Sequence, residues 1–299
     1  MRSFALVALL ALLWGGSYPL LKLAVETIPP MTVVAIRSLV GGLFLLALLG
    51  PRIRLFADVS SGASLRALSI QSAFNCIIPW ILVAHAMREI DAGLASILNS
   101  LSPIFIFLIT ALITRHEAVT ARKGVGVVLG LSGVLAIVGL DALENVGTKT
   151  VAELACVAGS LSYAIAGVIG VRFAKVTPLV PAAGTTLLAA AVMIPLALLL
   201  EHPWNATPSM RSLLAVLASA ILSTGLAMVV YFKLLATVGS IAMSSQAYLR
   251  IVVGVGLGIA FLGERPTTSM WIGLCLVVAG VVAMTLPSRK PASITRPSP

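Results

Sequence analysis

Charged residues are scarce in this chain of 299 residues, since Asp, Glu, Lys and Arg make up only 10% of it. Acidic residues are scarcer still, with 10 Asp and Glu against 20 Lys and Arg. A soluble domain normally draws about a quarter of its residues from these four types, and so little charge cannot cover a globule in water. The chain is therefore expected to lie in a lipid bilayer, in agreement with its mean hydropathy of +1.09.

The sequence also lacks the patterns that mark metal centres and enzyme active sites. Cys76, Cys156 and Cys275 all fall in apolar runs, without the paired spacing of a disulfide framework or a metal site. His116 has no second histidine at the spacing of a zinc protease, and residues 130–133 lack the spacing of a nucleophile elbow. We expect neither catalytic residues nor a cofactor or metal site.

Apolar runs long enough to cross about 30 Å of hydrocarbon as helices fill most of the chain. Clusters of charge and proline separate them, and their continuous apolarity predicts an all-α membrane protein with ten transmembrane helices. The predicted spans are 4–25, 31–50, 65–87, 93–113, 123–140, 150–171, 179–200, 211–236, 240–262 and 270–286.

One segment of the sequence is repeated at an offset of 147 residues. Asn99 corresponds to Gln246, and Glu117 corresponds to Glu264. If each copy holds five spans, the second copy enters the membrane from the opposite side, which predicts two inverted five-helix repeats around a central cavity. The predicted domains are a first repeat at 1–140, an external linker at 141–149, a second repeat at 150–286 and a disordered cytoplasmic tail at 287–299.

Basic residues are distributed unevenly between the two predicted faces of the membrane. Twelve lie on the face that carries both termini and five on the other face. Because cytoplasmic loops are enriched in Lys and Arg, both termini are expected in the cytoplasm. This bias explains the net charge of +10 without a nucleic-acid partner. The twelve are Arg2, Arg52, Arg54, Arg66, Arg115, Arg122, Lys123, Arg172, Lys175, Arg289, Lys290 and Arg296; the five are Lys22, Arg88, Lys149, Arg211 and Arg265.

Polar side chains inside the fourth and ninth spans mark a candidate substrate site. Two equivalent stripes in inverted copies would face each other near the midplane, and each carries an amide. The alternative is that both amides form hydrogen bonds between helices for packing alone. The first stripe is Ser96, Asn99 and Pro103 with Ser102 beside it, and the second is Met243, Gln246 and Arg250.

Arg250 is the most informative of these residues. It lies ten residues into its predicted span, about 15 Å deep at 1.5 Å per residue. An arginine at this depth costs roughly 2.5–3.5 kcal/mol on insertion scales, so it should face water or a partner. No carboxylate lies at a comparable depth, which leaves a substrate anion or the carbonyls of a helix end as partners.

Aromatic and small polar residues share helix faces in other spans. Together they predict a pocket for an apolar or aromatic body, although each residue alone could serve packing or an interfacial belt. Pro19, Pro79 and Pro103 are expected to bend their helices, and Arg37 is expected along an exit path. The residues of this group are Trp14, Ser17 and Tyr18 in the first span, Asn75, Pro79 and Trp80 in the third, Ser162 and Tyr163 in the sixth, and Tyr248 in the ninth.

The residues Trp14-Gly15-Gly16-Ser17, Arg37, Pro103, Glu117 and the glycine pair Gly126 and Gly133 together resemble the drug/metabolite transporter superfamily. Over nearly its full length the chain resembles the EamA-type ten-helix exporters, and more narrowly the YddG-like exporters of aromatic amino acids. The resemblance implies a carrier of small metabolites whose cavity is framed by helices one to four and six to nine, with helices five and ten as support. Glu117 and Glu264 would be structural. Arg250 departs from the family pattern, because it stands where the proline that matches Pro103 is expected.

We therefore expect a multi-pass protein of the cytoplasmic membrane that exports amino acids with aromatic or hydrophobic side chains by alternating access. Its partners would be this substrate and the lipid bilayer. Since the Asp and Glu residues lie in loops or near span ends, we expect no obligatory proton coupling. The alternatives are export of drugs or other amphiphiles, and flipping of lipid headgroups.

Overall fold

The computed structural model describes residues 2–50, 62–113, 120–138, 147–244 and 246–285, and the description below concerns these residues. All regular structure among them is helical. Of the expected external linker at 141–149, residues 141–146 lie outside the described residues, as do the expected tail at 287–299 and Glu117, whereas Thr148 and Lys149 already belong to the next helix.

The helices follow the predicted runs closely, and several runs consist of two helical segments. Short π- or 3₁₀-helical segments join the two parts in some of these runs. The α-helices are α1 (Arg2–Gly15), α2 (Ser17–Val25), α3 (Pro30–Leu49), α4 (Gly62–Ser72), α5 (Ile78–Ala86), α6 (Ala92–Leu98), α7 (Ser102–Leu108), α8 (Ala121–Val138), α10 (Thr148–Gly170), α11 (Leu179–Leu200), α12 (Met210–Ala218), α13 (Ala227–Ser244), α14 (Gln246–Leu262) and α15 (Thr268–Thr285).

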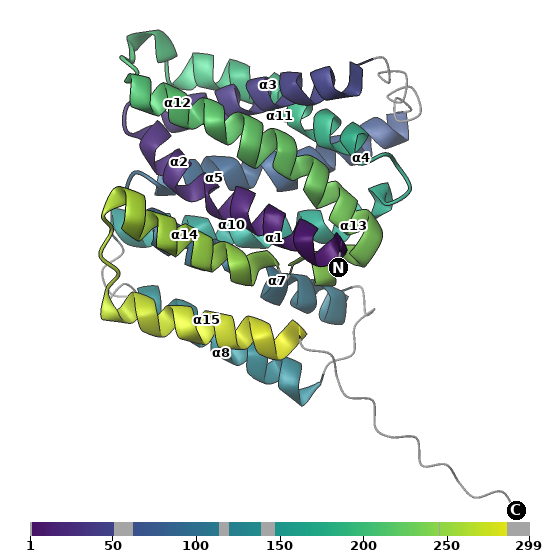
Figure 1. The fold of residues 1–299 in the computed structure, drawn as a ribbon, viewed down its shortest axis with the longest axis vertical. Coiled ribbons are helices and arrows are strands. Elements are labelled where there is room, and N and C mark those ends of the chain that lie inside the picture. The colour runs from purple at the N-terminus through teal and green to yellow at the C-terminus, as the bar shows by residue number, and fades with distance from the viewer. Residues whose placement is uncertain (1, 51–61, 114–119, 139–146, 245, 286–299) are drawn as a thin grey trace, which may run out of the picture.

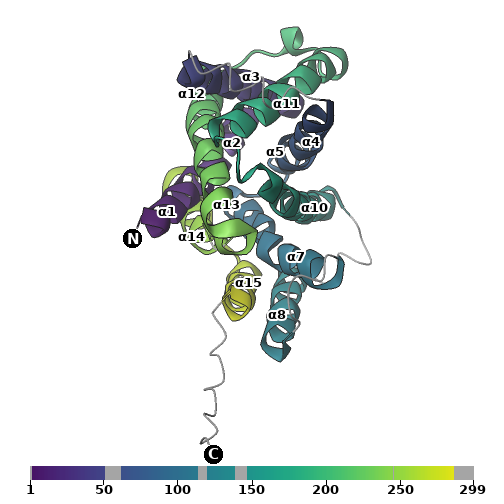
Figure 2. The same cartoon turned by 90° about the vertical axis from the view of Figure 1, so that its right-hand side faces the viewer.

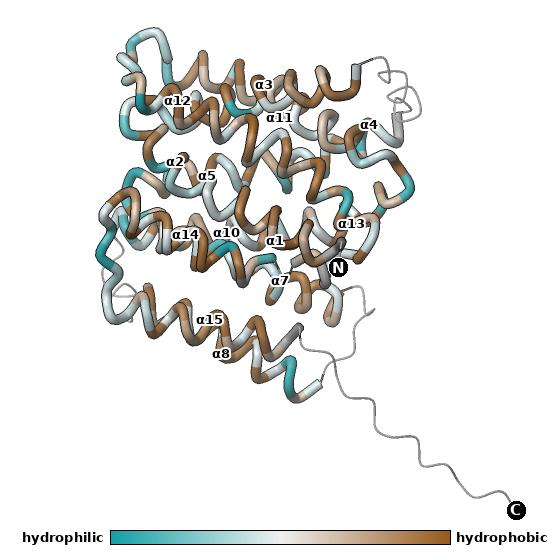
Figure 3. Tube along the Cα trace, in the orientation of Figure 1, coloured by the Kyte–Doolittle hydropathy of each residue, from teal (hydrophilic) through white to brown (hydrophobic). Residues whose placement is uncertain are grey.

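Seven helical runs of the described chain are long and apolar enough to cross a membrane. Two shorter apolar helices, Leu249–Leu262 and Thr268–Ala283, follow them in the sequence. Hydrophilic residues gather mainly at the helix ends, whereas the middle of each helix is largely apolar (Figure 3). The seven runs are Phe4–Val25, Pro30–Leu49, Ser64–Ala86, Ala92–Ile113, Thr148–Phe173, Leu179–Leu200 and Met210–Ser240.

Each of the three prolines expected to bend a helix lies at an interruption. Pro19 follows the break between α1 and α2 at Gly16. A π-helical segment at Ala73–Ile77 precedes Pro79, and a 3₁₀ turn at Asn99–Leu101 precedes Pro103. The interruptions follow from proline chemistry, since proline lacks the N–H that would bond to the carbonyl four residues earlier.

The helices run roughly parallel or antiparallel and form one elongated bundle (Figure 1). Residue 2 and the last residues of α15 lie at the same end of the bundle. The connections at 26–29, 87–91, 201–209 and 263–267 lie at the opposite end. Viewed from the side, α8 and α15 form one edge of the bundle, and α3, α11 and α12 form the other (Figure 2).

Helices at equivalent positions in the two halves of the sequence make equivalent contacts. The first helix of each half packs against a helix of the other half, α1 against α14 and α10 against α7. Likewise, α2 packs against α12 as α10 packs against α5. The pairs α3 with α11 and α8 with α15 each join one helix to its counterpart.

Glycines let α8 and α15 approach closely. A Cβ atom on Gly280 would lie 2.5 Å from the carbonyl oxygen of Gly126 and 2.7 Å from the nitrogen of Gly130. A Cβ atom on Gly133 would lie 2.9 Å from the carbonyl oxygen of Gly273. Contact between backbones at this distance leaves no room for side chains, so packing fixes these two helices against each other.

Carboxylates cap two helices at the end opposite the termini. Glu264 accepts hydrogen bonds from the N–H groups of Ala92 and Gly93, at 2.6 and 2.9 Å. Glu201 accepts them from Met31 and Thr32, at 2.9 and 2.7 Å. A carboxylate satisfies the free N–H groups at a helix start and the positive end of its dipole. Burial raises the pKa of the Glu264 carboxyl above its usual value, and the N–H groups of the cap partly oppose that shift. Both caps join the first half of the chain to the second.

Candidate functional site

The helix break before Pro103 sets the geometry of the site. Pro103 cannot donate an N–H to the carbonyl four residues earlier, which is that of Asn99. The chain responds with a 3₁₀ turn at Asn99–Leu101 between α6 and α7. The Asn99 carbonyl therefore lacks its normal α-helical donor and is available to a neighbouring helix.

Arg250 of α14 supplies that donor. Its Nη2 donates to the Asn99 carbonyl at 2.7 Å, and Nη2 and Nε donate to Oγ of Ser100 at 3.1 and 3.3 Å. The side chain is only 3% exposed. The structure thus shows a carbonyl at a helix break as a partner of Arg250. Its remaining amino group, Nη1, has no hydrogen-bond partner among the described residues.

A second buried arginine lies nearby on α3. Arg37 is 4% exposed, and its Nε and Nη2 donate to Oγ1 of Thr224 at 3.2 and 3.1 Å. Its guanidinium also lies over the Trp80 ring, 4.6 Å from the centroid, which is cation–π geometry. Thr224 belongs to a π-helical segment, Ser219–Leu226, and such segments often occur at functional sites.

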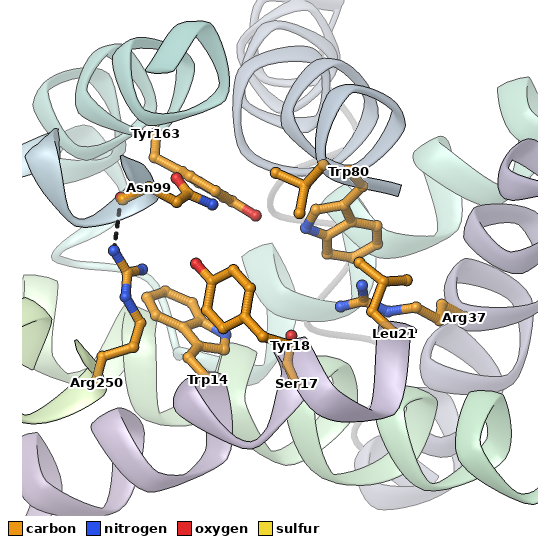
Figure 4. A pocket seen from close by; sticks show the side chains of 10 residues that line it. Trp14, Ser17, Tyr18, Leu21, Arg37, Trp80, Asn99, Tyr163 and Arg250 are labelled. Atoms are coloured by element: carbon orange, nitrogen blue, oxygen red, sulfur yellow. Dashed lines mark hydrogen bonds between the residues drawn. The ribbon is translucent and has the colours of Figure 1, made fainter. Parts of the chain in front are cut away.

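The two arginines line one cavity, which we call the arginine pocket. Figure 4 shows the guanidinium groups at opposite ends of it, with the rings of Trp14, Tyr18 and Tyr163 between them. About 400 Å³ of empty space lies in and around this cavity, solvent at its mouth included. The lining residues are Trp14, Ser17, Tyr18, Leu21, Arg37, Trp80, Val83, Asn99, Tyr163 and Arg250.

A second cavity, the amide pocket, adjoins the first. Trp14, Tyr163 and Arg250 line both, so these three side chains form the wall between them. The Trp14 ring lies 6.4 Å from that of Tyr163 and 5.4 Å from that of Tyr231, measured between centroids. The remaining lining residues of the amide pocket are Asn75, Ser102, Ile106, Tyr231, Met243 and Gln246.

Several buried polar atoms around these cavities have no partner within the described part of the chain. They include Oδ1 of Asn99 in the arginine pocket and Oε1 of Gln246 in the amide pocket. Leaving a buried acceptor without a donor costs about 1–3 kcal/mol. The two amides therefore do not satisfy each other by packing, and both present an oxygen that a ligand or water could use.

The charge of the arginine pocket is one-sided. Neither cavity has an Asp or Glu among its lining residues. Among the residues described, no ion pair joins Arg37 or Arg250 to a carboxylate. Buried charges in a membrane are normally paired or face water, so both guanidinium groups are suited to hold an anion.

Most of the side chains expected at the site line one of these two cavities. They come from helices far apart in the sequence that the fold brings together. They are Trp14, Ser17, Tyr18, Asn75, Trp80, Asn99, Ser102, Tyr163, Met243, Gln246 and Arg250.

The other expected residues, Pro79 among them, are not among those that line the two cavities. Ser96 is buried, with its Oγ 3.4 Å from the Arg250 carbonyl. Ser162 donates to the Phe74 carbonyl at 2.8 Å, within the π-helical segment before Pro79. Pro103 acts through the helix break described above. Tyr248 lies on α14, but its side chain is outside the described set.

The expected residues did not include all those that line the cavities. Arg37 was expected on an exit path but lines the arginine pocket itself, and Leu21, Val83 and Ile106 were not included. An arginine inside an apolar run was the signal available for Arg37. Aliphatic side chains carry no such signal, since every span is rich in them.

Comparison with known proteins places these features in a family. The model of the EamA-like transporter family matches this chain twice, at residues 1–139 and 150–286. Together the two matches leave out little more than the segment between them and the last residues.

Relatives of similar length are known from several bacteria. The uncharacterized inner membrane transporter YedA of Escherichia coli (strain K12) is 26% identical over 287 residues, which cover 95% of this chain and 90% of YedA. The uncharacterized transporter YoaV of Bacillus subtilis (strain 168) is 24% identical over 92% of this chain and 93% of its own length. A crystal structure with 21% identity superposes with a TM-score of 0.69 and covers 94% of this chain and 96% of that one, which supports the fold alone.

Proposed function

This chain belongs to the EamA-like transporter family and is a multi-pass membrane transporter; from that premise we propose that it exports small amphiphilic metabolites through the two central pockets. The proposed substrates are amino acids with aromatic or hydrophobic side chains, as in the YddG-like exporters that the sequence resembles. The observation that carries the proposal is the arginine pocket, which combines buried guanidinium groups with aromatic rings.

In this proposal Arg250 binds the substrate carboxylate through Nη1. The carbonyl oxygens of the Asn99 and Gln246 amides accept from the substrate ammonium, and their lack of a partner supports this role. Trp14, Tyr18 and Tyr163 enclose the apolar part, because flat rings offer large apolar area at little entropic cost.

Ten transmembrane helices in two inverted repeats, at 1–140 and 150–286, are the architecture that we propose for this transporter. The related contacts of α1 with α14 and of α10 with α7 support it. Substrate would reach the pockets from either end in turn, with the interruptions at Pro19, Pro79 and Pro103 as hinges. Both termini would lie in the cytoplasm, and the protein would reside in the inner membrane.

The proposed transport requires no proton. Proton-coupled carriers keep a titratable carboxylate or histidine chain in the membrane interior. The residues that line the two pockets include no Asp, Glu or His, which supports facilitated or exchange transport.

Counterflow in proteoliposomes without a proton gradient tests this function. Amino acids, nucleosides, sugars and dyes are offered in turn to the parent protein and to Arg250→Ala. Aromatic and hydrophobic amino acids should exchange, and Arg250→Ala should lower their rate by roughly tenfold or more, the factor for a lost hydrogen bond between charged groups. Lys233→Ala is the control, because Lys233 is exposed on α13 and lines neither pocket.

Two other outcomes would each favour a different function. Movement of dyes that does not depend on Arg250 indicates an exporter of drugs or other amphiphiles. Scrambling of labelled lipids indicates a flippase in which Arg250 binds the headgroup phosphate. Amino-acid exchange that requires a proton gradient contradicts the uncoupled mechanism.

A further inference from the structure

The arginine pocket holds two positive charges where the amino-acid export proposed above needs one. Arg250 comes from α14 in the second half of the chain, and Arg37 comes from α3 in the first half. Figure 4 shows them facing the same space from opposite ends, separated by aromatic side chains. A single carboxylate bound at Arg250 leaves the charge of Arg37 uncompensated.

Each guanidinium has N–H donors that no described residue accepts from. Of its five N–H groups, Arg37 uses those on Nε and Nη2 for Thr224, and Arg250 uses those on Nε and Nη2 for Asn99 and Ser100. Nη1 of each has no hydrogen-bond partner among the described residues. Because both residues line the cavity, these amino groups are the donors available to a bound molecule.

The fold also holds Arg37 in place from two sides. Thr224 accepts from its guanidinium edge, and Trp80 covers its face. Fixing a guanidinium in advance reduces the entropy lost when it binds an anion. Neither contact neutralises the charge, since a hydroxyl and an indole ring are both uncharged.

We propose that the preferred substrate is an organic anion with two acidic groups at opposite ends of an apolar or aromatic body. One acidic group binds Arg250 and the other binds Arg37, while the body lies against Trp14, Tyr18 and Tyr163. This inference rests on the proposed function, in that it takes the arginine pocket to be the transport site, and it specifies the charge of the substrate. A zwitterion brings one carboxylate, for Arg250, and no net charge, so Arg37 stays uncompensated, whereas a dianion compensates both arginines.

Four ligands with one phenyl body and different charges test the proposal. They are para-phenylenediacetate, a dianion; phenylacetate, a monoanion; phenylalanine, a zwitterion; and phenethylamine, a cation. Dissociation constants are measured on the full-length protein in nanodiscs, at a low concentration of buffer anions so that these do not compete. The dianion should bind more tightly than phenylacetate by roughly tenfold to a hundredfold, the factor for one further hydrogen bond between charged groups. Phenylalanine should bind more weakly than either, and phenethylamine should bind least.

Variants at Arg37 identify the second anion site. Arg37→Gln should remove the advantage of the dianion over phenylacetate, and Arg37→Lys should keep part of it, because the charge remains but the guanidinium fork is lost. Lys233→Gln removes an exposed charge from α13 and should change none of the four constants. Thermal denaturation of each variant shows whether it is folded.

The inference is wrong if phenylalanine binds as tightly as the dianion, if Arg37→Gln weakens the two anions equally, or if none of the four ligands binds. Counterflow separates this result from the proposed function. Exchange of phenylalanine without any preference for anions overturns the charge inference and leaves amino-acid export standing. Tight binding of the dianion without exchange of any ligand overturns the transport function, and leaves standing only that the arginine pocket binds dianions.

Discussion

Pro103 affects the site through a hydrogen bond that it cannot make. The missing N–H leaves the Asn99 carbonyl to Arg250, which donates to it at 2.7 Å. Proline in a helix interior is costly, about 3 kcal/mol in soluble proteins, and here the interruption positions a charged side chain. Pro103 thus destabilises its own helix and, by the same missing hydrogen bond, positions the Arg250 side chain.

Pro103→Ala should therefore stabilise the protein and impair transport. The alanine N–H can bond to the Asn99 carbonyl and competes with Arg250, so we expect unfolding to become harder by on the order of 1 kcal/mol. Transport at saturating substrate should fall several-fold as Arg250 loses its anchor. Thermal denaturation and counterflow measure the two effects on the same preparation.

Pro195 provides a matched control for this substitution. It lies inside α11, is exposed, and lines neither pocket. Pro195→Ala should stabilise its helix for the same reason and leave counterflow unchanged. Unimpaired transport by Pro103→Ala, or equal loss of transport in both variants, would contradict the role assigned to Pro103.

At the scale of whole helices, α8 and α15 differ from the rest of the bundle. They pack against each other through glycines and lie at one edge (Figure 2), and neither contributes to the lining of the arginine or amide pocket. The resemblance to EamA-type exporters implies this supporting role for the fifth and tenth helices. Their packing should therefore affect stability without affecting substrate affinity.

Gly280→Ala tests this separation. The added Cβ would lie 2.5 Å from the Gly126 carbonyl oxygen, so the helices must move apart, and overpacking of this kind costs about 1–3 kcal/mol. We expect a lower melting temperature, while the folded protein keeps its affinity for substrate. Gly124→Ala in α8 is the control: a Cβ there meets nothing within 4 Å, so it should stabilise the helix by about 0.5–1 kcal/mol. If Gly280→Ala weakens substrate binding while stability is unchanged, these helices do more than support the bundle.

The sequence predicts the helices well. It predicts only those residues of the site that the repeat or a charge inside an apolar run marks. Asn99, Gln246 and Arg250 were expected together because the offset of 147 residues places them on equivalent stripes, and all three line the cavities. Arg37 was expected nearer an exit, because depth along one helix does not reveal which neighbour covers it. Its position depends on Trp80 and Thr224, which contact it only once three helices pack together.

For the whole molecule, the number of membrane crossings decides whether two inverted repeats are possible. Residue 2 and the end of α15 lie at the same end of the bundle, as an even number of crossings requires (Figure 1). The nine apolar helices, seven long and two shorter, do not reach ten without α8, which is 18 residues long and carries Arg122 and Lys123 near its start. The arrangement in inverted halves therefore depends on α8 crossing the membrane.

Reporter fusions measure this directly. Green fluorescent protein, which fluoresces only when folded in the cytoplasm, and alkaline phosphatase, which is active only outside it, are each placed after Pro299 and at the exposed Gly147 between the halves. Ten crossings and the bias of basic residues predict fluorescence at the tail and phosphatase activity at Gly147. If α8 lies along the membrane surface instead, Gly147 and Lys175 beyond α10 exchange sides, so phosphatase would be inactive at Gly147 and the tail would no longer share a side with residue 2. That result would remove the inverted repeat and the alternating access built on it, because the second half would then enter the membrane from the same side as the first.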